Sequence, residues 1–298
     1  MKPEDLFALV QRLNGPMEAL GALAAELRVQ TEGLSPDPRV QRALDDVLSA
    51  LGLDLDALST LPDDAKVAAA GGISAFLRQA ADVVDNPTRA PGWAFTEPEF
   101  LQNQGRMSMP IAHVVAAIAP SLGDLAARLD GGKATFLDIG TGVGWLAIAM
   151  ATRFPGLSVV GIDVHETAID VGRENVAKAA LADRVVLRRQ DVLALTDRDA
   201  FDLAFVAAPF LEQSIVPAAL ERTRDALNPG GVLLFGTFAT IDEPLATATQ
   251  ALRIVRSGGH PWTLDEARDL VERAGLVDAH VIGRTWKAPI ALVAGRKA

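Results

Sequence analysis

The chain has 298 residues, 49% of them hydrophobic, which is enough to bury one large core or two ordinary ones. Its formal net charge of −10 argues against a nucleic-acid substrate, because binding of phosphates requires a basic surface. It contains no cysteine, which excludes disulfides, a thiolate nucleophile and cysteine-based metal sites. It also has no run of about 20 apolar residues and no secretory pattern at its start, so we expect a cytoplasmic protein that does not enter membranes.

The first part of the chain carries apolar residues at helical spacing, with little strand-like alternation. The helical stretches are 3–30, 38–51 and 63–84, and turn residues interrupt them at Gly15-Pro16, 33–38, Leu61-Pro62 and 86–92. We therefore expect an all-helical N-terminal region of three or four helices over residues 1–91. Such a region could cover apolar surface and form a homodimer contact, close over a substrate as a lid, or do both.

A connecting segment, 92–130, follows this region. It opens with an irregular mixture of aromatic, amide and methionine residues at 93–109, which does not read as a simple core helix. Residues 110–127 then predict a helix. The aromatic residues Trp93, Phe95 and Phe100 either pack in the core or form the wall of a pocket.

A glycine-rich turn follows the apolar run 136–139. Asp138 stands near the end of this run, and glycines occupy alternate positions at Gly140, Gly142 and Gly144, before a helix expected over 145–154. Glycine permits a tight turn and close approach of a ligand to the backbone, and the helix N-terminus directs N–H groups at that ligand. The turn predicts a nucleotide-cofactor site, although a packing role alone would also explain the glycines. It differs from the dinucleotide fingerprint, in which the third glycine comes one position later.

Three more strands are expected in the order of a parallel sheet. The run 157–162 ends at Asp163, whose carboxylate can accept hydrogen bonds from both hydroxyls of a ribose. The run 184–190 ends at Asp191, which either contacts a ligand or caps a turn. The run 201–209 is followed by a helical stretch, and the Pro-Gly-Gly turn at 229–231 then introduces a fifth apolar strand.

The C-terminal part predicts one more helix and two strands. Thr263 and Glu266 form a capping-box pattern at the start of a helix that Gly275 closes. Strands are expected over 276–282 and 289–294.

These features, taken in order, resemble the class I S-adenosylmethionine-dependent methyltransferases over roughly 131–298. The resemblance implies an α/β fold with a doubly wound, Rossmann-like, seven-stranded sheet and an antiparallel edge, so that 131–298 would be the catalytic domain. It implies S-adenosyl-L-methionine as cofactor and transfer of a methyl group to O, N or C of a small, largely apolar molecule, mainly by proximity and alignment. Secondary metabolism is a plausible setting for such an enzyme.

The resemblance also assigns roles to residues. In that family the strand-end acid and the glycine turn hold the methionine end of the cofactor, the next two strand-end acids meet ribose and adenine, and the fourth strand ends beside the methyl group. The segment before the first strand crosses the mouth of the pocket, so its candidates for ligand contact are Gln102, Gln104, Arg106, Met107 and Ser108. Arg106 would either pair with the cofactor carboxylate or form a surface ion pair. The implied cofactor-binding set is Asp138, Gly140, Gly142, Gly144, Asp163, Val164, Asp191, Val192, Ala207 and Arg106.

Catalysis is less clear from the sequence. Many small-molecule O-methyltransferases with a helical N-terminal region carry His-Asp-Trp just after the fourth strand, where this chain has Phe210-Leu211-Glu212. The absent histidine puts a histidine-base mechanism in doubt. Glu212, His260 and His113 remain candidates to orient or deprotonate an acceptor, whereas His165 and His280 are expected to have no catalytic role. Because Asp163 and Asp191 are assigned to the cofactor, we expect no metal site.

Two other functions stay open. One is a non-catalytic cofactor-binding protein on a methyltransferase scaffold, which the missing histidine allows. The other is an NAD(P)-dependent oxidoreductase, which the position of the third glycine and the Pro-Gly-Gly turn disfavour.

Overall fold

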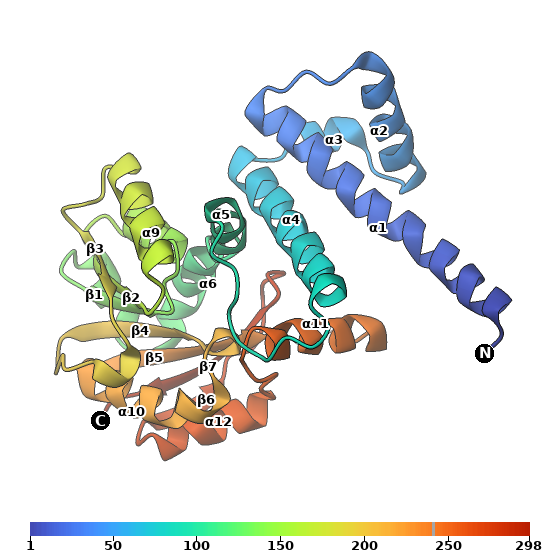
Figure 1. Cartoon of the computed structure of the whole chain (residues 1–298). Coiled ribbons are helices and arrows are strands. Elements are labelled where there is room, and N and C mark those ends of the chain that lie inside the picture. The colour runs from blue at the N-terminus through green and yellow to red at the C-terminus, as the bar shows by residue number, and fades with distance from the viewer. Residues whose placement is uncertain (240–241) are drawn as a thin grey trace. The chain divides into compact units, whose positions relative to one another are not determined.

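The computed structural model describes the whole chain except residues 240 and 241, and it divides into two compact units (Figure 1). Unit 1 comprises Met1–Pro87 and Gln102–Met107, and unit 2 comprises Thr88–Leu101 and Ser108–Ala298. The boundary between them falls inside helix α5 (Pro98–Arg106).

Unit 1 is helical, as predicted. Its main helices are α1 (Pro3–Glu32), α2 (Pro38–Ala50), α3 (Leu55–Ser59) and α4 (Asp63–Asp85). The interruption expected at Gly15-Pro16 does not occur, because α1 runs through Pro16. The φ angle of proline is compatible with a helix, so Pro16 weakens the helix only locally, through one missing hydrogen bond and a steric clash. A thirty-residue helix with tertiary contacts can tolerate this loss.

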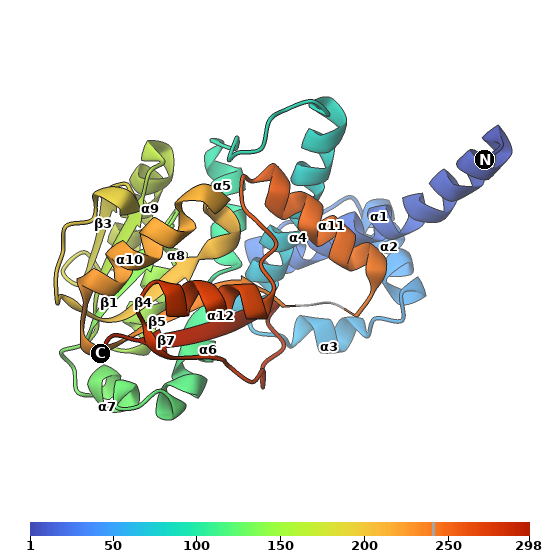
Figure 2. The ribbon, with the colours of Figure 1, turned by 90° about the horizontal axis from the view of Figure 1, so that it is seen from below.

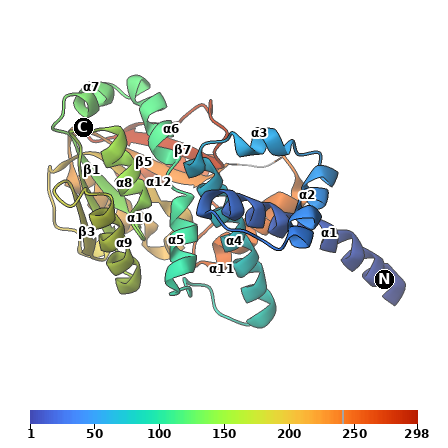
Figure 3. The same cartoon turned by 90° about the horizontal axis from the view of Figure 1, so that it is seen from above.

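The packing of α1 changes along its length. Its C-terminal half is buried within unit 1 at Ala19, Ala22, Ala24 and Leu27, where it packs against α2 and α4. The N-terminal half runs on beyond α2 and α4, as Figures 1 and 3 show. Large apolar side chains on this half are therefore exposed.

Unit 2 is built on a seven-stranded sheet of order β3-β2-β1-β4-β5-β7-β6. Its strands are β1 (Thr135–Ile139), β2 (Ser158–Asp163), β3 (Val185–Arg189), β4 (Phe201–Ala207), β5 (Leu227–Phe238), β6 (Val277–Val281) and β7 (Ile290–Arg296). The first five strands are parallel, while β7 pairs antiparallel with both β5 and β6. This confirms the predicted doubly wound sheet with an antiparallel edge.

The helices of unit 2 follow the predicted order with two differences. They are α6 (Ile111–Ile118), α7 (Leu125–Asp130), α8 (Trp145–Arg153), α9 (Glu166–Lys178), α10 (Val216–Ala226), α11 (Pro244–Arg256) and α12 (Leu264–Arg273). The helix expected over 110–127 is broken into α6 and α7, because Pro120 disfavours helical continuation and Gly123 adopts a φ of +63°. The segment expected to be irregular contains α5, whose apolar face buries Phe100 and Leu101.

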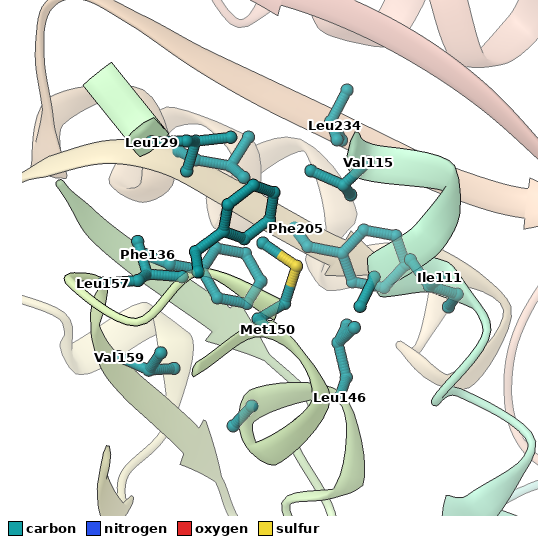
Figure 4. Packing of buried hydrophobic residues seen from close by; sticks show 14 of the residues in the cluster. Ile111, Val115, Leu129, Phe136, Leu146, Met150, Leu157, Val159, Phe205 and Leu234 are labelled. Carbon is teal, nitrogen blue, oxygen red and sulfur yellow. The ribbon is translucent and has the colours of Figure 1, made fainter. Parts of the chain in front are cut away.

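Both faces of the sheet are buried. On one face, Phe136, Met150, Phe205 and Leu234 belong to a core that includes residues of α6, α8 and α9 (Figure 4). The opposite core includes Leu137 and packs against α10 and α12, which lie side by side in Figure 2. Burial of adjacent residues of β1 on opposite faces is typical of a parallel sheet covered by helices, and it leaves the carboxyl edge for ligands. No helix in the described part of the chain is both long and apolar enough to cross a membrane.

Candidate functional site

The glycine turn lies between β1 and α8, with Gly140 exposed, Gly142 half-buried and Gly144 buried. Gly140, Gly142 and Gly144 have φ angles of +75°, +54° and +79°, which L side chains rarely adopt. A Cβ on Gly142 would meet no atom within 4 Å, and one on Gly140 would meet only Ala207 Cβ, at 3.8 Å. Packing therefore does not require glycine at these two positions, whereas their positive φ angles do, and the space beside them is open.

The third glycine has a packing role. A Cβ on Gly144 would lie 2.9 Å from Leu187 Cδ1 on β3, and the same leucine would be 2.6 Å from a Cβ on Gly161 or Gly172. The start of α8 can thus approach β2, β3 and α9 closely. Sequence reasoning missed Gly161 and Gly172, although an isolated glycine inside a strand or helix pattern is itself a signal of close approach.

Asp138 is buried beneath the turn, with 2% of its surface exposed. Thr141 Oγ1 donates a hydrogen bond to Asp138 Oδ2 at 2.7 Å. Burial raises the pKa of Asp138 to about 7, against the lowering effect of the Thr141 hydrogen bond and with a further raising effect from Asp163. A cationic group bound beside Asp138 would favour its carboxylate form. Thr141 is a site residue that the sequence analysis did not identify.

Asp163 connects the end of β2 to the glycine turn. Its Oδ2 accepts a hydrogen bond from Gly142 N at 2.9 Å, and its Oδ1 accepts one from His165 N, also at 2.9 Å. Each carboxylate oxygen has a second lone pair, so this arrangement still allows hydrogen bonds from two hydroxyls. Val164, beside it, is 52% exposed.

Asp191 follows β3, which is adjacent to β2 in the sheet. Its Oδ1 accepts a hydrogen bond from Leu193 N at 2.8 Å and so caps the short 3-10 turn 192–194. Val192 is buried. The capping role considered for Asp191 is present, and a carboxylate has further lone pairs with which it could also accept from a ligand.

Aromatic rings gather at the carboxyl ends of β2, β4 and β5. Trp93 lies 6.0 Å from Phe210 and 6.4 Å from His165 between ring centroids, and Phe210 lies 6.2 Å from Phe238. Trp93 also contacts Phe95 and Phe100, which stack at 3.9 Å, and its Nε1 donates to Phe95 O at 2.9 Å. We call this set the ring cluster; its members are Trp93, Phe95, Phe100, His165, Phe210 and Phe238.

The three candidate bases lie in different surroundings. Glu212 is exposed and lines a surface groove with Pro91, Gln213, Ser214 and Gly258. His260 packs against Trp262, with ring centroids 4.4 Å apart. His113 is exposed on α6.

The structure thus brings together the glycine turn, Asp138, Asp163 and Ala207 at one edge of the sheet. Of the mouth residues, Gln102, Gln104, Arg106 and Met107 belong to unit 1 and Ser108 to unit 2. Within unit 1, Arg106 Nη1 donates to Asn103 Oδ1 at 3.4 Å.

His280 lies exposed on β6 at the edge of the sheet. Among the residues that the structure describes, no group of three or more His, Cys, Asp or Glu side chains could hold a metal ion.

The central part of the chain is similar to known sequences. The model of a family described as "Methyltransferase domain" matches residues 136–231, from β1 into β5. The release factor glutamine methyltransferase of Rhodopirellula baltica is 36% identical over 107 residues, which cover 36% of each chain. The tRNA1(Val) (adenine(37)-N6)-methyltransferase of Porphyromonas gingivalis is 36% identical over 92 residues, 29% of this chain and 36% of that one. The matches therefore span only about a third of these relatives.

Comparison with solved structures extends over the whole chain. Human N-acetylserotonin methyltransferase, solved with S-adenosylmethionine, superposes with a TM-score of 0.67 at 16% identity and covers 100% of both chains. The mitomycin 7-O-methyltransferase MmcR gives 0.65 at 21% identity, over 99% of this chain and 97% of that one. An O-methyltransferase family protein from Burkholderia thailandensis gives 0.67 at 16% identity, over 100% and 98%. At these identities the likeness concerns the fold.

Proposed function

We propose that the chain is a class I S-adenosylmethionine-dependent methyltransferase with a helical N-terminal extension, and that it transfers the methyl group to O, N or C of a small, largely apolar molecule. The observation that carries the proposal is the connected arrangement of the open glycine turn, Asp138 and Asp163. S-adenosylmethionine presents a cationic ammonium group, a ribose diol and an adenine ring, which match these groups in chemistry.

Each end of the cofactor has a proposed partner. Asp138 and the backbone of Gly140 and Gly142 would hold the methionine end, because a buried acid beneath an open turn suits an ammonium group. Asp163, with Val164 beside it, would hold the ribose. Asp191 and Val192 would meet the adenine.

Three further residues complete the proposed cofactor-binding set. Ala207, at the end of β4 and facing Gly140, would lie beside the methyl group. Gly144 would contribute through its place in the turn, in addition to its packing role. Arg106 stays a candidate partner of the cofactor carboxylate.

Methyl transfer requires mainly alignment of the acceptor with the sulfonium that the cofactor supplies. The chain's own contribution is a rigid turn. Thr141 holds Asp138, Asp163 holds Gly142 N, and the α8 N-terminus packs against β3 through Gly144. Such a turn fixes the position of the cofactor, so an acceptor bound at the end of β4 would meet the methyl group in line.

Several observations favour a small-molecule acceptor over a protein or tRNA. The structural relatives named for mitomycin and N-acetylserotonin cover the whole chain, including the helical extension, whereas the relatives named for release factors and tRNA match only about a third of it. The net charge of −10 disfavours tRNA. No side chain from Ala207 to Phe210 is polar, so no side chain at this end of β4 would orient an amide or an exocyclic amine.

Calorimetric titration of the purified chain with S-adenosylmethionine, S-adenosylhomocysteine and NAD tests the proposal. We expect micromolar binding of the first two and none of NAD. Binding of NAD alone would contradict the cofactor assignment. If the cofactor binds but a panel of phenols, amines and keto acids is not methylated, the non-catalytic binding protein becomes the better description.

We also propose that the helical region 1–91 forms a homodimer and covers the site, that 92–130 lines the site mouth, and that 131–298 is the catalytic domain. The dimer proposal rests on the part of α1 from Leu6 to Leu20. Its exposed residues Leu6, Val10, Leu13, Met17 and Leu20 are each 46% to 56% exposed, and their spacing alternates between four and three residues. We call this set the α1 seam.

The α1 seam suits a second copy of the same helix. The alternating spacing is that of paired helices, which bury such a stripe against each other. The flanking positions that would approach the partner carry no charge: Phe7, Leu9, Asn14, Pro16, Gly21 and Leu23. Two identical helices could therefore pair without repulsion between like charges.

A Leu13→Glu variant is expected to be monomeric under conditions in which the parent chain is a dimer, because it places a carboxylate in the middle of the buried stripe. Sedimentation velocity at micromolar concentration measures this. Val84→Glu is the matched control, because Val84 is 78% exposed on α4 and lies outside the α1 seam. We expect the Val84→Glu variant to stay dimeric. A monomeric parent chain, or a Leu13→Glu dimer, would contradict the proposal.

A cytoplasmic, secondary-metabolic setting remains a prediction from the sequence.

A further inference from the structure

The loop 257–262, which follows α11, packs against the segment that leaves β4. A Cβ built on Gly259 would overlap Pro209 O, so glycine alone lets the two backbones approach this closely. Gly258 has a φ of +92°, and a Cβ built on it would lie 3.9 Å from Glu212 Cγ. The first half of the loop therefore lies directly beside the residues that follow β4.

The second half of the loop is fixed to β5. Trp262 O accepts a hydrogen bond from Thr237 Oγ1 at 3.3 Å, and Trp262 N donates one to His260 O at 2.9 Å. Thr237 follows Gly236, which pairs with Ala207 at the end of β4. His260 is thus held where the ends of β4 and β5 meet, next to the proposed methyl position.

The side chain of His260 is half-buried, and its ring packs on that of Trp262 with centroids 4.4 Å apart. The Trp262 ring lies 6.4 Å from that of Phe235 on β5. Hydrogen bonds from Thr263 lower the pKa of Glu266 on α12, and the nearby charge of His260 lowers it further. The Glu266 carboxylate in turn favours the protonated form of the imidazole.

Other charged side chains lie on the elements that pack around this loop. They are Arg89, Glu212, Arg253, Arg256, Asp265 and Glu266. Arg89 and Arg256 donate to backbone carbonyl groups, Asp265 pairs with Arg268, and Glu212 lines the surface groove. Carboxylates and guanidiniums stay charged near neutral pH, whereas imidazole exchanges a proton there. His260 is therefore the group in these surroundings that is suited to accept a proton.

We infer, on the basis of the proposed function, that His260 is the general base that takes the proton of the methyl acceptor. The chain has no histidine just after β4, at Phe210-Leu211-Glu212, but the loop after α11 brings one against this segment from another element. His165 follows β2, which β1 separates from β4, and so belongs to the ribose side of the proposed site. The acceptor is then a hydroxyl compound that is still protonated at neutral pH.

The imidazole of His260 contributes by removing a proton as the new bond forms. The proton of the acceptor hydroxyl passes to a nitrogen of the neutral imidazole. A lone pair of the oxygen forms the O–C bond to the methyl group, and the electron pair of the S–C bond stays on sulfur. Glu266 favours the resulting imidazolium until its proton leaves to water. Attack by an oxygen that kept its proton would instead place a positive charge on that oxygen.

The place of His260 can be tested without an acceptor. S-adenosylmethionine carries a positive sulfonium where S-adenosylhomocysteine carries a neutral sulfur. A positive charge beside an imidazole disfavours its protonation, so the titration midpoint of His260 should be lower in the first complex by about 0.5 pH units or more. Proton NMR at saturating ligand measures it, because the chain has four histidines and a His260→Gln variant assigns the signal. His280, on the edge strand β6, is the control and should titrate alike in both complexes.

The outcomes of this titration are distinct. Equal midpoints of His260 in the two complexes would overturn the inference, because the methyl position would then be remote from the loop. A shift of His280 as large as that of His260 would overturn it too, since the effect would not be local. Failure of both ligands to bind would contradict the proposed function instead.

The His260→Gln variant also tests the proton transfer itself. With 4-methylphenol as acceptor we expect kcat to fall about 100-fold with little change in KM, because a general base typically contributes at least this factor. With 4-nitrophenol, which is largely ionised at pH 8, the loss should be less than about threefold. Imidazole added to a His260→Ala variant should restore part of the rate with 4-methylphenol. His280→Gln is the matched control and should keep the rates of the parent chain.

A structural role of His260 gives a different result. Equal losses with both phenols, without rescue by imidazole, would show that the substitution disturbs the loop, and they would overturn the inference. An unchanged kcat with 4-methylphenol would overturn it as well. Methylation of amines but of neither phenol would overturn the inference and leave the proposed function intact.

Discussion

An Asp163→Ala variant is expected to bind S-adenosylmethionine more weakly by roughly 2–4 kcal/mol, which is about 30- to 1,000-fold in Kd. The substitution removes the two charge-assisted hydrogen bonds that we propose Asp163 makes to the ribose. It also leaves Gly142 N and His165 N without the acceptor they share, so the glycine turn loses its connection to β2. Isothermal titration at pH 8 measures the loss.

Two controls separate these contributions. Asp163→Asn keeps one oxygen that can accept a hydrogen bond and should lose less affinity than Asp163→Ala. Glu166→Ala removes a negative charge three residues later, from an exposed pair with Arg189, and should change Kd by no more than about threefold. An Asp163→Ala variant with the Kd of the parent chain would mean that the ribose lies elsewhere.

Replacing Asp138 with asparagine is expected to stabilise the fold and weaken cofactor binding. Burial raises the pKa of Asp138 to about 7, whereas an aspartate in an unfolded chain titrates near 3.8. The folded state therefore binds this proton more tightly than the unfolded state. Its contribution to stability is complete below about pH 4 and is lost as the pH rises through about 7.

Asparagine resembles the protonated acid at every pH and can still accept the Thr141 hydrogen bond. At pH 8, urea unfolding followed by tryptophan fluorescence should give a free energy of unfolding higher than that of the parent by roughly 2–4 kcal/mol. At pH 4 the two proteins should differ little. Equal stability differences at both pH values would contradict the titration of Asp138 as the cause.

Cofactor binding should change in the opposite direction. The carboxylate of Asp138 is the proposed partner of the methionine ammonium, and a neutral amide cannot replace its charge. We expect the Kd for S-adenosylmethionine to rise at least about tenfold at pH 8. In the parent chain, affinity should increase with pH up to about 7 and then level off. A buried acid that destabilises the empty fold but binds a cation is a common arrangement at functional sites.

The sequence by itself determined those features of the protein that depend on local backbone geometry and periodicity. Glycines after an apolar run specify a tight turn because other residues avoid positive φ, and all three glycines have it. The capping box at Thr263 and Glu266 forms as predicted, since both groups lie within one helical turn. Alternation of such strands and helices was sufficient to predict the parallel sheet.

Only the tertiary structure decided features that depend on residues far apart in the chain. Burial of Asp138 by surrounding helices and strands raises its pKa, and no local pattern reports this burial. The contact of Trp93 with Phe210 joins segments more than a hundred residues apart. At Pro16 the local preference of proline predicted a break in the helix, but α1 continues through this residue because of its contacts elsewhere. Local rules act through single residues and turns, whereas burial and ring contacts arise only when distant segments pack together.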